Sequence, residues 1–337
     1  MANDLKNDPA YWNAADLAAR EDWRLALSTE ATRELETATQ TLAEKRPPEI
    51  TLDDLKLPHC QKLMGEIRGV LENGPGLVRL DGLPAFEWSS ETIINAFWLL
   101  GLHLGHPHPQ DADGKLIHDV RDTGADINKE NVRIYQTNLE QEFHNDGGDV
   151  FMLLCRRKAK AGGRSRMASV PALFAEIQNR RPDLAEVLTQ PFYFDARGQQ
   201  LPGRPPVQKV PLITLHDGRP YALQKRAYIR FAQRFDDVPR LTNPQIEALD
   251  LLDALCADPE FQFSYEMESG QIAIGLNHVT LHARDSYEDF DNLDDRRHMV
   301  RLWLGLPNGP SLPDHYRDTR EFGPLFDITQ RKPLHNQ

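Results

Sequence analysis

The first third of the chain spaces its apolar residues as helices do. The segment from Trp23 to Glu44 is rich in Ala, Leu, Glu and Thr, and the segment from Leu52 to Glu72 places apolar residues about one helical turn apart. Asn73-Gly74-Pro75-Gly76 ends this pattern, because Gly and Pro interrupt helices. The apolar run from Leu77 to Leu80 then predicts a strand.

From about residue 131 the pattern changes to short apolar runs separated by turn residues. The runs that predict strands are Val132 to Thr137, Val150 to Arg156, Phe192 to Asp195, Lys209 to Leu215, Phe261 to Met267, Gln271 to Asn277 and His298 to Leu306. Further helices are predicted from Ser89 or Ser90 to about Leu104, from near Ser169 and from near Thr242. Many short strands between turn signals predict a mainly β core with α additions, closed as a sandwich or jelly roll.

The composition excludes several classes of partner. The 337 residues include 39 Lys and Arg against 51 Asp and Glu, a net charge of −12, and no basic run offsets it. Because nucleic-acid binding depends on clustered cations, we expect no nucleic-acid partner. The sequence contains no run of about 18 apolar residues, which a membrane-spanning helix would need. The three cysteines lie far apart and the first residues lack a secretory pattern, so we expect a reducing, cytoplasmic setting.

One histidine carries a carboxylate at a spacing that suits metal binding. Of the 12 histidines, only His144 is followed two residues later by an acidic residue, Asp146. In an extended segment, residues i and i+2 project to the same face, so an imidazole nitrogen and a carboxylate oxygen lie side by side. The pattern is common by chance, and a loop histidine with ordinary hydrogen bonds is the alternative.

The second half of the pattern lies about 130 residues downstream, where His278 and His282 follow a predicted strand. Either would complete a set of two histidines and one carboxylate, which suits non-haem Fe(II) and leaves coordination sites open. In the final strand, alternation places Arg297 and Arg301 on one face. Buried arginines require anions, and a guanidinium holds a carboxylate through paired hydrogen bonds, so a dicarboxylate cosubstrate is predicted. A surface strand with solvated arginines is the alternative.

The pairing of FHNDGGDVFMLLC with LHARDSYEDFDNLDDRRHMVRLWL resembles the taurine dioxygenase-like family of Fe(II)- and 2-oxoglutarate-dependent oxygenases. The resemblance covers about Leu77 to Leu312. It implies a clavaminate-synthase-like fold, which is a double-stranded β-helix (jelly roll, cupin-like) core flanked by helices. It also implies Fe(II), 2-oxoglutarate and O2 as cofactors and cosubstrates.

The resemblance assigns roles residue by residue. It implies His144, Asp146 and His282 as catalytic iron ligands, with His278 as the rival for the third position. It implies Arg297 for the far carboxylate of 2-oxoglutarate, with Arg296 as a substitute because the gap after His282 is a few residues longer than in the taurine enzyme. The remaining assignments are Ser165, which supports the same cosubstrate in place of a commoner Thr, and Arg301, which contacts an anionic substrate. Halogenating relatives carry a small residue in place of Asp146, so no chlorination is expected.

These assignments predict an oxidoreductase that hydroxylates or otherwise oxidises a small, anionic organic substrate and releases succinate and CO2. The expected division is a helical segment 1–76, an oxygenase domain 77–312 with helical insertions, and a carboxyl-terminal tail 313–337. We expect a small-molecule partner, and the resemblance is compatible with a homo-oligomer. Two other functions remain open. One is a catalytically silent jelly-roll protein that binds a small anion, and the other is a metal-dependent hydrolase or isomerase on a cupin-like barrel.

Overall fold

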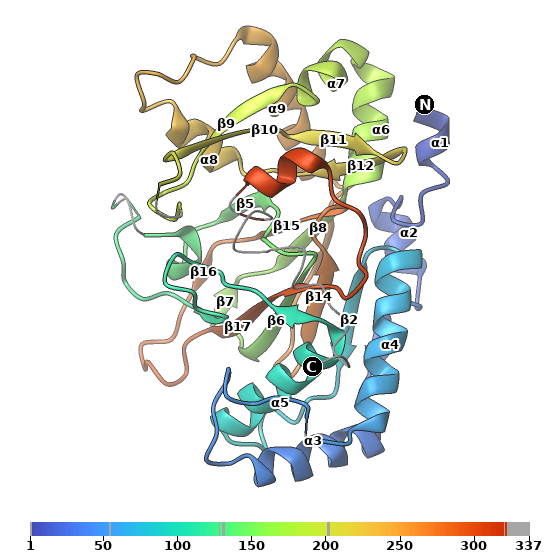
Figure 1. Cartoon of the computed structure of the whole chain (residues 1–337), viewed down its shortest axis with the longest axis vertical. Helices are drawn as coiled ribbons and strands as arrows, with labels where there is room; N and C mark the ends of the chain where they lie inside the picture. Colours follow the sequence, from blue (N-terminus) through green and yellow to red (C-terminus); the bar gives the residue numbers. More distant parts are fainter. Residues whose placement is uncertain are drawn as a thin grey trace.

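Two sheets form the centre of the protein, for which a computed structural model describes residues 2–53, 55–127, 129, 132–200, 203–319 and 321 (Figure 1). The larger sheet has the strand order β1-β2-β14-β6-β17-β3, and β4 also pairs with β17. Its strands are β1 (Arg24–Ala26), β2 (Leu77–Asp81), β3 (His106–Pro107), β4 (Ile117–Val120), β6 (Val150–Arg157), β14 (Ile272–Leu276) and β17 (His298–Gly305). Its pairs are antiparallel, except that β1 and β2 run parallel.

The smaller sheet is antiparallel and has the order β13-β8-β15-β5. Its strands are β5 (Gln141–His144), β8 (Ser165–Ser169), β13 (Phe263–Tyr265) and β15 (Thr280–Arg284). Side chains from both sheets share one buried cluster, in which Phe151, Met299 and Trp303 of the larger sheet meet Met167 and Tyr265 of the smaller one. The two sheets therefore pack face to face around a common interior, as in a jelly roll.

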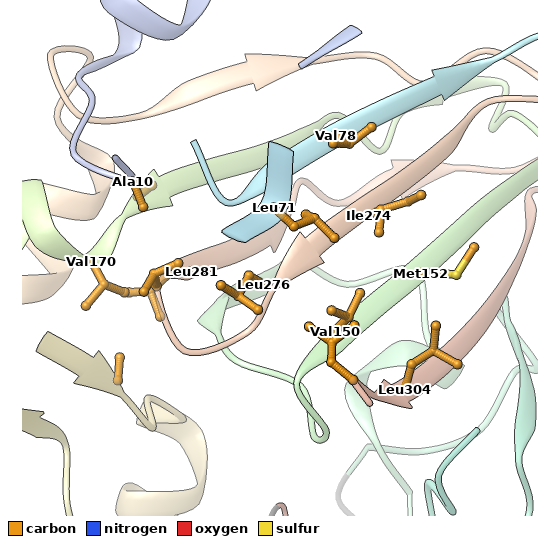
Figure 2. Packing of buried hydrophobic residues seen from close by; sticks show 14 of the residues in the cluster. Ala10, Leu71, Val78, Val150, Met152, Val170, Ile274, Leu276, Leu281 and Leu304 are labelled. Atoms are coloured by element: carbon orange, nitrogen blue, oxygen red, sulfur yellow. The ribbon is translucent and has the colours of Figure 1, made fainter. Parts of the chain in front are cut away.

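Alternation along the strands gives the larger sheet two apolar faces. Val150 and Met152 of β6 and Ile274 of β14 belong to the main hydrophobic core, whereas Phe151 points to the cluster between the sheets. Figure 2 shows this outer layer, in which Leu71 lies beside Ile274 and Val78 lies above them in the view. Three helices complete the layer, α3 (Thr29–Thr41), α4 (Pro58–Asn73) and α5 (Ser90–Leu104). Burial on both faces explains why the sequence of β14 is continuously apolar.

The remaining elements extend from the other side of the smaller sheet, where α6, α7 and α9 pack together (Figure 1). The helices are α1 (Ala2–Leu5), α2 (Ala14–Ala19), α6 (Val170–Arg180), α7 (Pro182–Leu188), α8 (Arg226–Ala232) and α9 (Asn243–Ala257). Three separate two-stranded antiparallel pairs are β9 (Pro191–Asp195) with β10 (Val207–Pro211), β11 (Ile213–His216) with β12 (Arg219–Ala222), and β7 (Ala161–Gly162) with β16 (Tyr287–Glu288). Two short 3-10 helices are η1 (Ile134–Gln136) and η2 (Asp314–Asp318).

Two predicted elements differ from the structure. The strand predicted from Val132 to Thr137 is the 3-10 helix η1, because the Gln136 side chain accepts a hydrogen bond from the Arg133 N–H at 2.9 Å and closes a turn. The helix predicted from Trp23 begins only at Thr29. Residues 24–26 instead extend the larger sheet, and Ser28 caps the helix by accepting a hydrogen bond from the Ala31 N–H at 3.1 Å.

The ends of the chain leave two expectations as predictions. Of the predicted tail 313–337, residues 320 and 322–337 lie outside the described part of the chain, and the division into 1–76, 77–312 and 313–337 stays a prediction.

Among the helices of the described residues, none combines the length and apolar character needed to cross a bilayer.

Candidate active site

Three residues predicted as metal ligands converge at the edge of the smaller sheet. His144 ends β5 and lies directly opposite His282 of β15 in the antiparallel register, and Asp146 follows β5. One ligand atom of each residue lies within 4.8 Å of those of the other two. The Asp146 carboxylate is 3.9 Å from Nε2 of His144 and 3.5 Å from Nε2 of His282. The strand register therefore brings together two histidines that are 138 positions apart in the sequence (282 − 144).

Two asparagines fix the loop that follows β5. Asn145 accepts a hydrogen bond from the Gln224 backbone N–H at 2.7 Å and donates to the Asn277 carbonyl. Asn277 accepts from the Asp146 N–H at 3.2 Å and donates to the Gly147 carbonyl at 2.8 Å. These buried hydrogen bonds hold the Asp146 backbone in one conformation, so the carboxylate is aimed before any ion binds.

The hydrogen bonds of His144 select the tautomer that a metal requires. Nδ1 lies 2.8 Å from the Glu142 carbonyl, which only accepts, so Nδ1 carries the proton. Nε2 lies 2.8 Å from the Gln141 side-chain amide, which donates to it. Burial and the neighbouring His282 lower the pKa of His144 to about 3. The imidazole is therefore neutral, and its Nε2 lone pair, which accepts from Gln141, lies 3.9 Å from the Asp146 carboxylate.

Arg301 of β17 holds the Asp146 carboxylate from the other side. Its Nη1 donates to both carboxylate oxygens, at 3.1 and 3.3 Å, and its Nε donates to the Gln110 side chain at 2.7 Å. Burial alone would raise the pKa of Asp146, but Arg301 and the imidazoles lower it well below its ordinary value. Asp146 is therefore an anion, as a metal ligand must be.

The structure places the rival histidine elsewhere. His278 is fully buried, packs against the Tyr221 ring at 5.1 Å and lies 3.8 Å from the Asp149 carboxylate. It is not part of the cluster formed by His144, Asp146 and His282. His282, by contrast, packs between two rings, with centroids 4.2 Å from His144 and 4.3 Å from Phe151.

An inner cavity extends from this cluster between the two sheets, and it contains two buried arginines. We define the inner cavity by its polar lining residues. They are Ser165, His282, Arg284 and Arg297, together with His144, Asp146 and Arg301. Arg297 is 4% exposed, and its Nη1 makes no hydrogen bond within the described part of the chain. Burial lowers the pKa of Arg297, and burial together with Arg297 lowers the pKa of Arg284 to about 10.

Both guanidinium groups lie against the same ring. Arg284 and Arg297 are 4.7 and 5.0 Å from the centroid of Tyr287, and the Arg297 backbone N–H donates to Asp289 at 2.7 Å. Two buried guanidinium groups beside one ring repel each other, and an anion bound between the two arginines and the metal cluster would compensate their charge. The donor set therefore fits a dicarboxylate whose far end meets Arg297, with Ser165 on the same wall.

A pair of glycines allows the chain to approach Arg297 closely. Gly162 and Gly163 have φ of 75° and 73°, in the left-handed region that favours glycine. A Cβ on Gly163 would lie 3.4 Å from Nε of Arg297 and 3.4 Å from Cβ of Tyr287. The glycines line a separate small pocket, which shares Ser165 and Arg297 with the inner cavity.

An outer cleft of about 190 Å³ opens on the other side of the metal cluster. It shares His144, Asp146 and Arg301 with the inner cavity, and Tyr135 and Trp303 line it as well. The Arg301 guanidinium lies 5.0 and 4.8 Å from the centroids of these two rings. The cleft and the inner cavity therefore reach the metal cluster from different sides.

A histidine supports this wall of the cleft. His118 lies 3.1 Å from the Tyr135 hydroxyl and 2.9 Å from the Asp111 carboxylate. Burial and the charge of Arg301 lower the pKa of His118 to about 4, so the imidazole is neutral at pH 7.

The opposite wall is held by an ion pair with the end of the described chain. Lys225 lines the cleft and donates to the Glu321 carboxylate at 2.5 Å, and both side chains are buried. The Glu321 carbonyl also accepts from the N–H of Gly148, in the loop that follows Asp146, at 3.3 Å. The cleft wall and the ligand loop are therefore tied to the same residue.

Sequence reasoning brought six residues to this region, and all six line the two cavities. They are His144, Asp146, Ser165, His282, Arg297 and Arg301. Arg296, the substitute for Arg297, is instead half-buried and lines neither cavity, and its Nε donates to the Phe290 carbonyl at 3.0 Å. Sequence reasoning missed Arg284, although its position two residues after His282 is the same alternation that paired His144 with Asp146.

Comparisons with known proteins agree with this arrangement. The sequence model of the family described as "Taurine catabolism dioxygenase TauD, TfdA family" matches residues 35–303. FR-33289 synthase of Streptomyces rubellomurinus is 29% identical over 312 residues, which cover 90% of this chain and 91% of that protein. Uridine-5'-phosphate dioxygenase of an Amycolatopsis species is 28% identical over 174 residues, which cover 50% of this chain and 62% of that protein.

The fold also matches that of a solved structure. Asparagine oxygenase in complex with Fe(II), 2S,3S-3-hydroxyasparagine and succinate superposes with a TM-score of 0.61 at 20% identity, over 84% of this chain and 93% of that one. The likeness confirms the predicted jelly-roll core flanked by helices.

Proposed function

The chain belongs to the TauD, TfdA family of Fe(II)- and 2-oxoglutarate-dependent dioxygenases, and on that premise we propose that it oxidises a small anionic substrate. In the balanced reaction, substrate, 2-oxoglutarate and O2 give hydroxylated substrate, succinate and CO2. One atom of O2 enters the new hydroxyl group and the other enters succinate. Bound Fe(II) supplies the activation of O2 that a protein side chain cannot supply.

The convergence of His144, Asp146 and His282 is the observation that carries this proposal. Two imidazoles and one carboxylate with ligand atoms within 4.8 Å of one another match the ligand set of non-haem iron oxygenases. In this proposal the three side chains hold Fe(II). The hydrogen bonds of His144 and the pairing of Asp146 with Arg301 keep two of the ligands in the protonation states that iron requires.

The inner cavity supports the binding of 2-oxoglutarate in one orientation. Arg297 is proposed to hold the far carboxylate, because its buried Nη1 has no other acceptor within the described residues. Ser165 adds a hydroxyl donor on the same wall. The near end of the cosubstrate then lies toward the metal cluster, and the outer cleft is left for the substrate.

The cations of the outer cleft support an anionic substrate. Arg301 lies at the junction of the cleft and the inner cavity, beside the rings of Tyr135 and Trp303. The rings provide apolar contact and the guanidinium provides a charged anchor near the site of oxidation. A relative named for a phosphorylated substrate, uridine-5'-phosphate dioxygenase, is consistent with a substrate of this charge.

The test is to measure succinate formed from 2-oxoglutarate by the purified protein, with and without ferrous iron. We expect slow, iron-dependent succinate production without added substrate, and faster production when an anionic substrate is added. A catalytically silent binding protein would give none under anaerobic iron loading followed by exposure to air. The variant Asp146→Ala is expected to abolish iron-dependent turnover, and near-normal succinate production from it would refute the ligand assignment.

A further inference from the structure

Gln141 lies where the outer cleft and the inner cavity meet. Four residues line both spaces, and the other three are His144, Asp146 and Arg301. His144 and Asp146 are the metal ligands proposed above, and Arg301 donates to Asp146 and to Gln110. Gln141 therefore adds a neutral amide, with two N–H donors and one oxygen acceptor, at the metal-side end of both spaces.

An irregularity in β5 aims the Gln141 side chain at the metal cluster. His144 pairs with His282 and Gln141 pairs with Arg284, so three residue steps along β5 match two along β15. In a regular strand, residues three apart project to opposite faces of the sheet. The extra residue of β5 forms a bulge, and the amide nitrogen of Gln141 lies 2.8 Å from Nε2 of His144. Bulges are over-represented next to active sites, where they redirect a side chain.

The backbone of Gln141 is fixed, whereas its side chain is held by a single hydrogen bond. Arg284, its partner in β15, donates to the carbonyls of Thr137 and Leu139, which lie just before β5. The contact with His144 is the one hydrogen bond that the Gln141 side chain makes within the described part of the chain. The amide can therefore leave His144 without breaking another contact, and it turns about a fixed Cα at the junction of the two spaces.

The Gln141 amide and a metal ion compete for the same lone pair. His144 carries its proton on Nδ1, so Nε2 has one lone pair, and Gln141 occupies it in this structure. One lone pair cannot both accept this hydrogen bond and coordinate an ion. His144 can therefore bind Fe(II) only after the Gln141 N–H has moved away. In the metal-free protein the same contact satisfies an imidazole nitrogen that would otherwise lack a donor.

The amide that leaves His144 is a donor on the side of the inner cavity. Arg284, which pairs with Gln141 in the sheet, lines the inner cavity and not the outer cleft. In the function proposed above, the near end of 2-oxoglutarate lies toward the metal cluster, and this end carries a carboxylate. Arg301 is already engaged by Asp146 and Gln110 at this junction. A carboxylate accepts hydrogen bonds from neutral N–H groups as well as from cations, so Gln141 supplies a matching donor.

Resting on the function proposed above, we propose that Gln141 is a positioning residue with two successive partners. In the metal-free protein its amide donates to Nε2 of His144. When His144 binds Fe(II), the amide turns away and donates to the near carboxylate of 2-oxoglutarate. Compared with an apolar side chain at this position, Gln141 makes metal binding weaker and cosubstrate binding tighter. 2-Oxoglutarate therefore binds best to a site that already holds its ion.

The two partners predict effects of opposite sign in Gln141→Leu, which keeps the approximate size of the side chain and removes the amide. Fe(II) is titrated by calorimetry into the metal-free protein under anaerobic conditions, without 2-oxoglutarate. We expect the variant to bind Fe(II) about threefold to tenfold more tightly, because one hydrogen bond no longer has to be broken. 2-Oxoglutarate, titrated into the Fe(II)-loaded protein, should bind about tenfold more weakly, because one hydrogen bond to a charged group is lost.

Glu140→Gln is the matched control. Glu140 is the adjacent residue, lines the outer cleft but not the inner cavity, and pairs with Arg166. Both affinities of this variant should stay within about twofold of those of the wild type. Gln141→Ala, which also lacks the amide, makes the same comparison if Gln141→Leu does not fold. A substitution that only disturbed the structure of the site would weaken the binding of both Fe(II) and 2-oxoglutarate.

Two results would each overturn the proposal. Unchanged or weaker Fe(II) binding by a folded Gln141 variant would show that the amide does not compete with the ion, and unchanged 2-oxoglutarate binding would show that it does not contact the cosubstrate. Iron binding and iron-dependent succinate production of the wild type are measured on the same preparations. If the wild type shows both and the opposite effects are absent, the role of Gln141 is wrong and the oxygenase function stands. If the wild type shows neither, the proposed function itself fails.

Discussion

His144 and His282 lie directly opposite each other in the pairing of β5 with β15, with their ring centroids 4.2 Å apart. This register makes a specific prediction about the third ligand. His282→Gln is expected to lose stoichiometric Fe(II) binding and to lower iron-dependent succinate production by at least about 100-fold, because one of three protein ligands is removed. The control is His278→Gln, which alters a buried histidine outside the cluster. It should bind iron even if its melting temperature falls. The assignment would be wrong if the two variants lost iron equally.

The lining of the inner cavity predicts that two arginines adjacent in the sequence affect the KM for 2-oxoglutarate differently. Arg297→Gln should raise the KM for 2-oxoglutarate by about 100-fold, the effect of losing a charge-assisted, paired contact to a carboxylate. Arg296→Gln removes the adjacent arginine, which does not line the inner cavity, and should leave this KM within about twofold. Initial rates of succinate formation at varied 2-oxoglutarate give both values. A large effect of Arg296 would favour the substitute that the sequence left open.

Gly163 offers a test with a matched control. Gly163→Ala and Gly198→Ala both place a side chain at positive φ, 73° and 69°, so each should lower the free energy of unfolding by about 1 kcal/mol. Only the Cβ at Gly163 meets Arg297 and Tyr287, whereas the Cβ at Gly198 would meet open space. We therefore expect the KM for 2-oxoglutarate to rise several-fold in the first variant and to remain unchanged in the second. Chemical denaturation and steady-state kinetics measure the two effects separately. Equal kinetic effects would exclude a cavity-specific role.

The stability of the metal-free protein should depend on pH through His118. Its pKa is about 4 in the folded protein and near 6.5 when unfolded, so the unfolded chain binds more protons between these values. Stability contributed by the neutral imidazole is therefore present above about pH 6.5 and is lost as the pH falls toward 4. The loss amounts to at most about 3 kcal/mol. Urea denaturation of the wild type and of His118→Gln across this range should give a shallower slope for the variant. Parallel slopes would show that His118 does not contribute.

The sequence predicted the centre of the site better than its surroundings. His144 and Asp146 are two residues apart, so local strand geometry was sufficient to pair them. Choosing His282 over His278 needed the family resemblance, because both follow the same strand and only the long-range register separates them. Arg133 and Arg197 carried no comparable signal. Their places in the cleft depend on a turn at residues 134–136 and on a positive φ at Arg197, which periodicity does not reveal.

The errors in the fold have related causes. The apolar alternation of residues 132–137 is that of a strand, but the Gln136 side chain satisfies the Arg133 N–H and favours a turn. Residues 24–26 lie within a helical composition and still form β1, because β2 offers an open edge for parallel pairing. Local propensity was outweighed in each case by a hydrogen-bond partner that the local pattern does not contain.

The ion pair of Lys225 with Glu321 has a practical consequence for work with this enzyme. A chain shortened by a few residues too many, ending before position 321, would leave an ammonium group buried in the substrate cleft without its carboxylate. It would also remove the carbonyl that accepts from Gly148, next to the iron-binding loop. Chains that end soon after β17 should therefore yield folded but poorly active enzyme, and affinity tags are better fused at the amino terminus.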